Sequence, residues 1–202
     1  MTAPLPSRYG DDFTGSTDGL EALASRGIHA VRFTRLPPNA ERAAFPHARA
    51  IGLAGDGRRR PTEWIDTRFP AIFAQRRGLG AGWSHHTVCS TLDSAPHPGL
   101  IGRAPDLGLA AFGKRSAVVL VGAPQLRRRT SQGHRFAAYP GANHRIERHP
   151  TMGRRPAKPM AESDLLVHPS RQADAPLALL VAGGQRMQTR PQGSQTPPRA
   201  RR

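Results

Sequence analysis

The sequence has few cysteines, lysines, aromatic residues and long apolar runs, and each shortage argues against a class of protein. Cys89 is the only cysteine among 202 residues, so an intrachain disulfide is impossible and a cysteine-based metal site is not expected. Aromatic residues make up 5% of the chain, too few for a platform that stacks single-stranded nucleic acid. No run of about eighteen apolar residues is present for a membrane span, and residues 1–8 lack the apolar core of a signal peptide. We therefore expect a soluble, cytoplasmic protein.

The chain is strongly basic, with 30 Lys and Arg residues against 14 acidic ones and a formal net charge of +16. The first 56 residues are balanced, so the whole excess lies in the rest of the chain. Such asymmetry is typical of nucleic-acid binding. However, lysine occurs only at positions 114 and 158, and the arginines are scattered. We favour a coding sequence rich in G and C as the cause, and nucleic acid is not the expected partner.

Short apolar runs alternate with helix-like stretches along the chain. Strands are expected at 28–34, 48–54, 83–89 and 117–121, the last being the clearest buried strand, and helices at 16–26, after Pro61 and at 99–112. This alternation predicts an α/β fold, a mostly parallel sheet with helices on both faces in a Rossmann-like three-layer sandwich.

The polar stretch at residues 9–18, YGDDFTGSTD, precedes the first predicted helix and is the strongest candidate for a site. Gly10 and Gly15 allow a ligand to approach the backbone closely, near the free N–H groups of the first helical turn. Asp11 and Asp12 cannot face the same way, so one is expected to order the loop and the other to contact a hydroxyl or act as a base. An ordinary helix cap is the alternative.

Polar or glycine-rich loops also follow the later strands, at residues 55–58, 90–94 and 122–124. In open α/β sheets, ligands bind outside the carboxyl ends of the strands. We therefore expect all four loops to meet at one cleft.

Several motifs, taken in their order and spacing, resemble the four-carbon acid sugar kinases, which phosphorylate threonate, erythronate or 3-oxo-tetronate with ATP. These motifs are YGDDFTGSTD at 9–18, VCSTLDS at 88–94 with GLIGR at 99–103, VGAP at 121–124, and RHPTM at 148–152 with its following PM and SDL. The resemblance covers residues 5–180 and implies an N-terminal domain, 1–180, that binds the sugar acid. A second half, beyond this resemblance, would carry the nucleotide site.

Residues 181–202 fall outside the resemblance and form a basic tail rich in Gln and Pro, of the kind a shifted reading frame produces. Its composition predicts disorder. A tail that binds RNA or an acidic partner is the alternative.

Three departures from the family pattern stand out. Thr87 occupies the place of a lysine that could pair with an acidic substrate. After VGAP the family is apolar and aromatic around an Arg-Tyr pair, whereas residues 127–132 of this chain are RRRTSQ, which would be costly to bury. Residues 4–8, where the resemblance implies a buried first strand, contain two prolines, so this strand is expected to be degraded or to lie on an edge.

The resemblance and the loop chemistry together select the site residues. Asp12 is the expected catalytic or hydroxyl-binding residue, and Asp11 the one that orders the loop, although the two roles could be exchanged. Arg58 is a candidate partner for the substrate carboxylate, because a planar guanidinium matches its geometry; a solvated surface arginine is the alternative. The remaining expected substrate contacts are Thr14, Gly15, Ser16, Ser90, Thr91, Asp93, Ser94 and Arg103. Cys89 is expected to be a packed core thiol.

No metal site made by the protein alone is expected. His85 and His86 are adjacent on a predicted strand and so point to opposite faces. ATP and Mg²⁺ would be held by the second half of the family's proteins.

Two function classes follow: the substrate-binding half of a sugar-acid kinase, inactive alone, or a basic nucleic-acid-binding or type III effector-associated interaction protein. The oligomeric state is left open.

Overall fold

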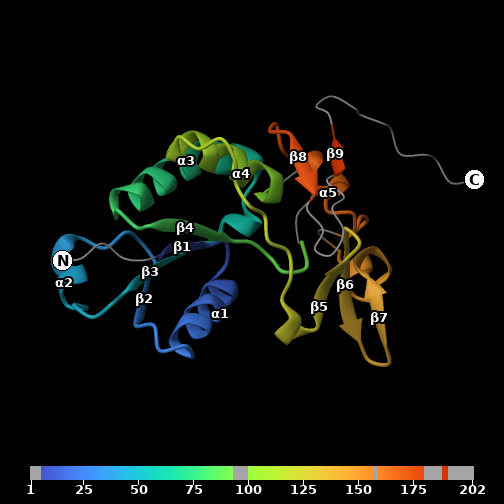
Figure 1. The fold of residues 1–202 in the computed structure, drawn as a ribbon, viewed down its shortest axis with the longest axis horizontal. Helices are drawn as coiled ribbons and strands as arrows, with labels where there is room; N and C mark the ends of the chain where they lie inside the picture. Colours follow the sequence, from blue (N-terminus) through green and yellow to red (C-terminus); the bar gives the residue numbers. More distant parts are fainter. Residues whose placement is uncertain (1–5, 93–99, 157–158, 180–187, 191–202) are drawn as a thin grey trace, which may run out of the picture.

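The computed structural model describes residues 6–92, 100–156, 159–179 and 188–190. Its first part is a parallel sheet with strand order β2-β3-β1-β4, covered by α1 on one face and by α3 and α4 on the other (Figure 1). The elements are β1 (Pro6–Gly10), α1 (Phe13–Ala24), β2 (Ala30–Phe33), α2 (Asn39–Ala43), β3 (Ala50–Ala54), the 3₁₀ turn η1 (Gly57–Arg59), α3 (Thr62–Gly78), β4 (Trp83–Thr87) and α4 (Leu100–Phe112). The predicted α/β class is confirmed.

β1 is a central strand, which corrects the expectation of a degraded or edge strand. It pairs in parallel with β3 on one side and with β4 on the other. Pro6 is its first residue, where a missing N–H disturbs the ladder least. Arg8 donates hydrogen bonds to the Gly19 carbonyl and, at 2.8 Å, to Thr87 Oγ1. These bonds give its guanidinium group polar partners between the sheet and α1.

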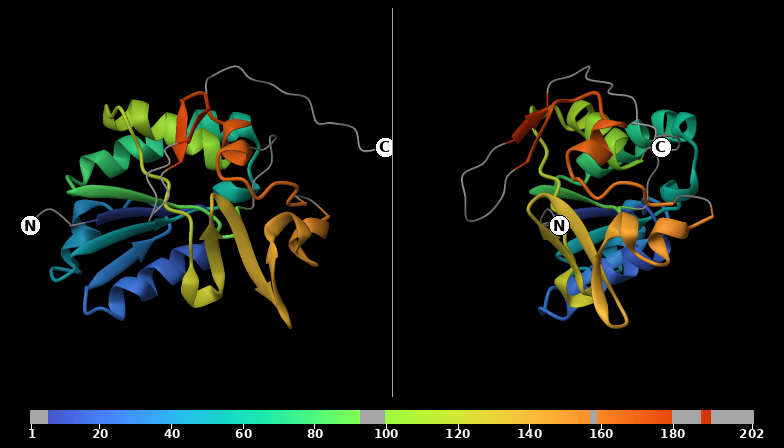
Figure 2. Two further views of the ribbon diagram at one scale, coloured as in Figure 1. Left: turned by 45° about the vertical axis from the view of Figure 1, so that its right-hand side comes forward. Right: turned by 90° about the vertical axis from the view of Figure 1, so that its right-hand side faces the viewer.

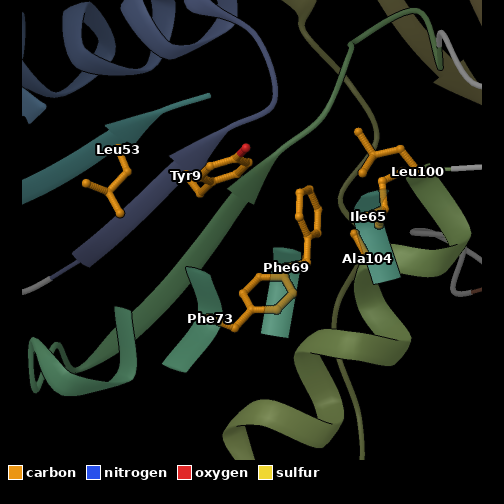
Figure 3. Packing of buried hydrophobic residues seen from close by; sticks show 7 residues of the cluster. All are labelled: Tyr9, Leu53, Ile65, Phe69, Phe73, Leu100 and Ala104. Carbon is orange, nitrogen blue, oxygen red and sulfur yellow. The ribbon is translucent and has the colours of Figure 1, made fainter. Parts of the chain in front are cut away.

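The main core lies between the sheet and the pair α3 and α4. Ile65, Phe69 and Phe73 recur at four-residue spacing, so one face of α3, the helix predicted after Pro61, meets the sheet. Figure 3 shows Phe69 against Tyr9 of β1 and Phe73 against Phe69, with Leu53, Leu100 and Ala104 completing the cluster. Burying each large apolar side chain contributes roughly 1.5–3 kcal/mol.

The expected buried strand at 117–121 is wrong. No strand forms there, and Val118 and Leu120 are 93% and 92% exposed. The run connects α4 to Ala123, which bridges Arg128. An apolar run becomes a buried strand only when a neighbouring strand pairs with it, and among the described residues β4 pairs only with β1.

The second part of the chain is a small antiparallel sheet beyond the carboxyl ends of the parallel strands (Figure 2). Leu92, Ile101, Ala137, Ile146 and Met160 form a second core that joins this sheet to the end of β4 and to α4. Its elements are η2 (Pro124–Leu126), β5 (Arg128–Ser131), β6 (His134–Tyr139), β7 (Ala142–Arg145), η3 (Ile146–Arg148), η4 (Met152–Arg154) and α5 (Val167–Ser170).

A two-stranded pair follows, β8 (Leu177–Leu179) with β9 (Gln188–Arg190). β9 lies inside residues 181–202, the segment whose composition predicts a disordered tail, and that description of the tail stays a prediction. Among the described residues, no helix is both long and apolar enough to cross a membrane.

Candidate functional site

The candidate site lies where the chain leaves β1 and β3, two adjacent strands, toward opposite faces of the sheet. α1 follows β1 on one face, and α3 follows β3 on the other (Figure 1). Loops that diverge in this way expose the strand ends between them, which is the usual ligand position in open α/β sheets. The first loop carries Asp11 and Asp12, and the second carries Arg58.

Arg58 bridges the two carboxylates. Its Nη2 lies 2.6 Å from Asp11 Oδ1, its Nε 3.3 Å from Asp11 Oδ2, and its Nη1 2.5 Å from Asp12 Oδ2. The Arg58 backbone N–H also donates to the Asp11 carbonyl at 3.0 Å, which fixes the second loop on the first. Burial lowers the pKa of Arg58, but the hydrogen bond and charge of Asp11 outweigh it, so the pKa lies above its ordinary value.

Asp12 also caps α1, because its Oδ1 accepts the Gly15 N–H at 2.7 Å. The helix therefore begins at Phe13, three residues before the predicted start. The side chain of Asp12 is 28% exposed and that of Asp11 only 2%. The accessible carboxylate is thus the one expected to meet a ligand, and the buried one orders the loop, although that functional division stays a prediction.

Gly10 and Gly15 are placed where a side chain would collide with site atoms. A Cβ at Gly15 would lie 2.7 Å from Asp12 Oδ1, and one at Gly10 would lie 2.0 Å from Ser16 Oγ. Ser16 Oγ donates to the Asp12 carbonyl at 2.5 Å, so this hydroxyl holds the loop. Thr14 lies exposed beside them on the first turn. The structure thus brings together the five predicted residues of the first loop and Arg58.

The third predicted loop starts close to the first, because the Asp11 N–H donates to the Thr87 carbonyl at the end of β4, at 3.2 Å. The Cys89 sulfur lies 3.0 Å from Oγ1 of Thr91, which is buried. The neighbouring Ser90 is held by two arginines, as described below. Asp93 and Ser94 lie outside the described residues.

Arg103 lies elsewhere. From α4 it donates to Asp66 of α3 at 2.6 Å and to Asp174 at 2.7 Å, and Asp106 lies 3.9 Å away. The hydrogen bond to Asp66 raises the pKa of Arg103 despite some burial, with the charges of the other carboxylates adding. This arginine joins α3, α4 and the segment around Asp174, and its substrate role stays a prediction.

Two arginines that the sequence analysis did not select converge on Ser90. Arg135 donates to the Ser90 carbonyl through Nη2 and, at 2.8 Å, through Nε. Arg128 Nη1 donates to Ser90 Oγ. The sequence HRFAAY of β6 shows no clear apolar alternation, and only the structure reveals that Arg135 and Ala137 share the buried face of this strand. The sequence therefore held no signal that would have selected this arginine.

The site residues do not fit a resident Mg²⁺ or a nucleotide phosphate. Among the described residues, no group of three His, Cys, Asp or Glu side chains could hold a metal ion. Both site carboxylates are paired with Arg58, and the N-terminus of α1 already binds the Asp12 carboxylate, which would repel a phosphate.

The histidines on β4 offer no alternative metal site. Burial, with the positive charges of Arg76 and His85 adding, lowers the pKa of His86 to about 3. Both ring nitrogens of His86 are buried without a hydrogen-bond partner, and the ring packs against Tyr9 and Phe69. His86 is therefore a neutral core residue at physiological pH.

The chain matches the family described as "Sugar-binding N-terminal domain" over residues 7–195. It is 42% identical over 176 residues to the 3-oxo-isoapionate kinase of Paraburkholderia graminis, in an alignment that covers 87% of this chain and 37% of that kinase. The chain therefore spans well under half the length of this curated relative.

Two crystal structures share the fold. A Salmonella typhimurium LT2 protein described as a tRNA synthase superposes with a TM-score of 0.74 at 24% identity, over 86% of this chain and 39% of that chain. A Haemophilus influenzae protein of the family DUF1537 gives a TM-score of 0.69 at 22% identity, over 83% and 39% of the two chains. At these identities the likeness concerns the fold alone.

Proposed function

We propose that this chain, which belongs to the family of sugar-binding N-terminal domains, binds a four-carbon sugar acid as the substrate-binding part of an ATP-dependent kinase. The observation that carries the proposal is the Asp11–Arg58–Asp12 arrangement at the diverging ends of β1 and β3. The relative that is named a kinase of 3-oxo-isoapionate supports a sugar-derived acid as the ligand. Threonate, erythronate and 3-oxo-tetronate are the candidate acids.

Asp12 is the residue proposed to meet the substrate. Its carboxylate is held in place by Arg58 and by the Gly15 N–H, so it accepts a hydrogen bond from a substrate hydroxyl without reorienting. Phosphoryl transfer depends mainly on such positioning, together with acceptance of the hydroxyl proton. Asp11 contributes indirectly, because it fixes Arg58 from its buried position.

ATP, when bound to the complete kinase, supplies the phosphoryl group. The residues of the candidate site do not fit a nucleotide phosphate, since the N-terminus of α1 is capped by Asp12. We therefore expect the isolated chain to bind the acid weakly and to show no measurable turnover with ATP.

Calorimetric titration with threonate and erythronate tests the proposal. Asp12→Asn retains a capping side chain but loses the charge, so the fold should survive and the affinity should fall about tenfold or more. Asp18→Asn is the matched control, because Asp18 is exposed on the same helix and should leave the affinity unchanged. Equal affinities of the Asp12 variant and the unaltered chain would remove Asp12 from the site.

A further inference from the structure

Arg58, the guanidinium expected to bind the substrate carboxylate, is already paired with two carboxylates. It contacts Asp11 through two nitrogens and Asp12 through the third. The three groups together carry a net charge of −1, which favours hydroxyl donors and disfavours a second carboxylate. The acidic group of a sugar acid therefore needs a different partner.

Arg135 has the features of such a partner. Its side chain is 0% exposed, two of its nitrogens bond the Ser90 carbonyl, and Nη1 has no hydrogen-bond partner. Among the described residues, no carboxylate forms an ion pair with it. Burial, with the charge of Arg128 adding, lowers the pKa of Arg135 to about 10. A buried cation that lacks a counter-ion is costly, and a bound anion would offset that cost.

Arg128 brings a second positive charge to the same residue. It lies on β5, opposite Ala137 of β6, and its Nη1 donates to Ser90 Oγ. Arg128 is only partly buried, so its side chain is accessible to a ligand. Two guanidinium groups on Ser90 repel each other, and an anion placed between them would turn this repulsion into attraction.

The basic pair lies next to the Asp11–Arg58–Asp12 group. The Asp11 N–H donates to the Thr87 carbonyl at 3.2 Å, and Ser90, which both arginines contact, follows three residues later. The region thus has an end that suits hydroxyls and an end that suits an anion, which matches the two ends of a hydroxy acid.

We propose that Arg128 and Arg135, at Ser90, bind the carboxylate of the sugar acid whose hydroxyls meet Asp12. This subsite rests on the proposed function, and it assigns substrate recognition to β5 and β6 of the small antiparallel sheet. Arg128 makes the direct contact, and the buried Arg135 supplies the positive field behind it.

The test compares Arg128→Gln with Arg129→Gln. Arg129 is the next residue of β5 and is exposed, so its variant loses the same charge away from Ser90. Two probes are used. The effect of sulfate is the rise in Tm relative to sodium chloride of equal ionic strength. The affinity for threonate is measured by calorimetry and compared with the affinity for threitol, a neutral polyol. Arg135→Met serves as a second variant, which retains volume without charge.

We expect Arg128→Gln and Arg135→Met to lose the sulfate effect and to weaken threonate binding about tenfold or more, since a charged hydrogen bond is removed. The affinity for threitol should not change in these two variants. Arg129→Gln should retain both the sulfate effect and the threonate affinity of the unaltered chain. Unaltered threonate affinity and sulfate response in both variants would overturn the subsite while leaving the sugar-acid function in place. A sulfate effect that depends on Arg128, without threonate binding by the unaltered chain, would refute the proposed function and keep the anion site.

Discussion

Arg58 Nη2 lies 2.6 Å from Asp11 Oδ1, although 47 residues separate the two along the chain. The side chains are 16% and 2% exposed, so the ion pair is shielded from water and from salt. This contact joins the loop after β1 to the loop after β3, and the position of Asp12 depends on it.

Asp11→Asn should destabilise the fold. The substitution removes one of the two carboxylates that face a largely buried guanidinium. Breaking a buried pair outright costs about 3–5 kcal/mol, and since Asp12 still pairs with Arg58 we expect a loss at or below the lower end of that range. Urea denaturation at pH 7 measures the change in the free energy of unfolding. Arg60→Gln breaks an exposed ion pair with Asp56 and should cost less than about 1 kcal/mol. Comparable losses in the two variants would show that the Asp11 pair has no special role in stability.

Gly10→Ala should also destabilise the chain, because the new Cβ would lie 2.0 Å from Ser16 Oγ and 3.0 Å from the Ser16 backbone. Overpacking of this kind costs about 1–3 kcal/mol. Gly78→Ala at the end of α3 is the control, since nothing lies within 4 Å of its Cβ position. The control should be neutral or slightly stabilising. Equal Tm values for the Gly10 variant and the unaltered chain would contradict the close packing of β1 against α1.

His86 makes the stability depend on pH. The pKa of its buried ring is about 3 in the folded chain, against an ordinary value of 6.5. Between these values the unfolded chain binds a proton that the folded chain does not, so stability is fully present above pH 6.5 and falls as the pH decreases. The slope is at most about 1.4 kcal/mol per pH unit.

His86→Leu should therefore lose less stability between pH 7 and pH 5 than the unaltered chain, as urea denaturation at the two values would measure. His29→Gln provides the comparison, because His29 is exposed. The same pH dependence in the unaltered chain and the His86 variant would assign the acid sensitivity to other groups.

Leu120→Ala should change the free energy of unfolding by less than about 0.5 kcal/mol, because Leu120 is 92% exposed. Leu53→Ala in β3 should cost about 2–5 kcal/mol, since Leu53 is part of the main core. Chemical denaturation of both variants measures the difference. A loss at Leu120 as large as that at Leu53 would mean that residues 117–121 form the buried strand expected from the sequence.

The sequence by itself determined those features that depend on residues close together along the chain. The four-residue spacing of Ile65, Phe69 and Phe73 defines the buried face of α3 wherever that helix packs. The polar loop before α1 likewise follows from local chemistry, since a carboxylate beside free N–H groups caps a helix. The alternation of strands and helices was sufficient to predict the α/β class.

Features that depend on distant partners were decided only by the tertiary structure. The two prolines in residues 4–8 suggested a weak first strand, yet β3 and β4 pair with β1 on both sides. The same apolar character that buries β3 leaves residues 117–120 exposed, because apolar periodicity does not specify which strand is available for pairing. The pairing of Arg58 with Asp11, and the meeting of Arg128 and Arg135 at Ser90, likewise arise from folding, because charge interactions depend on distance in space and not on separation along the chain.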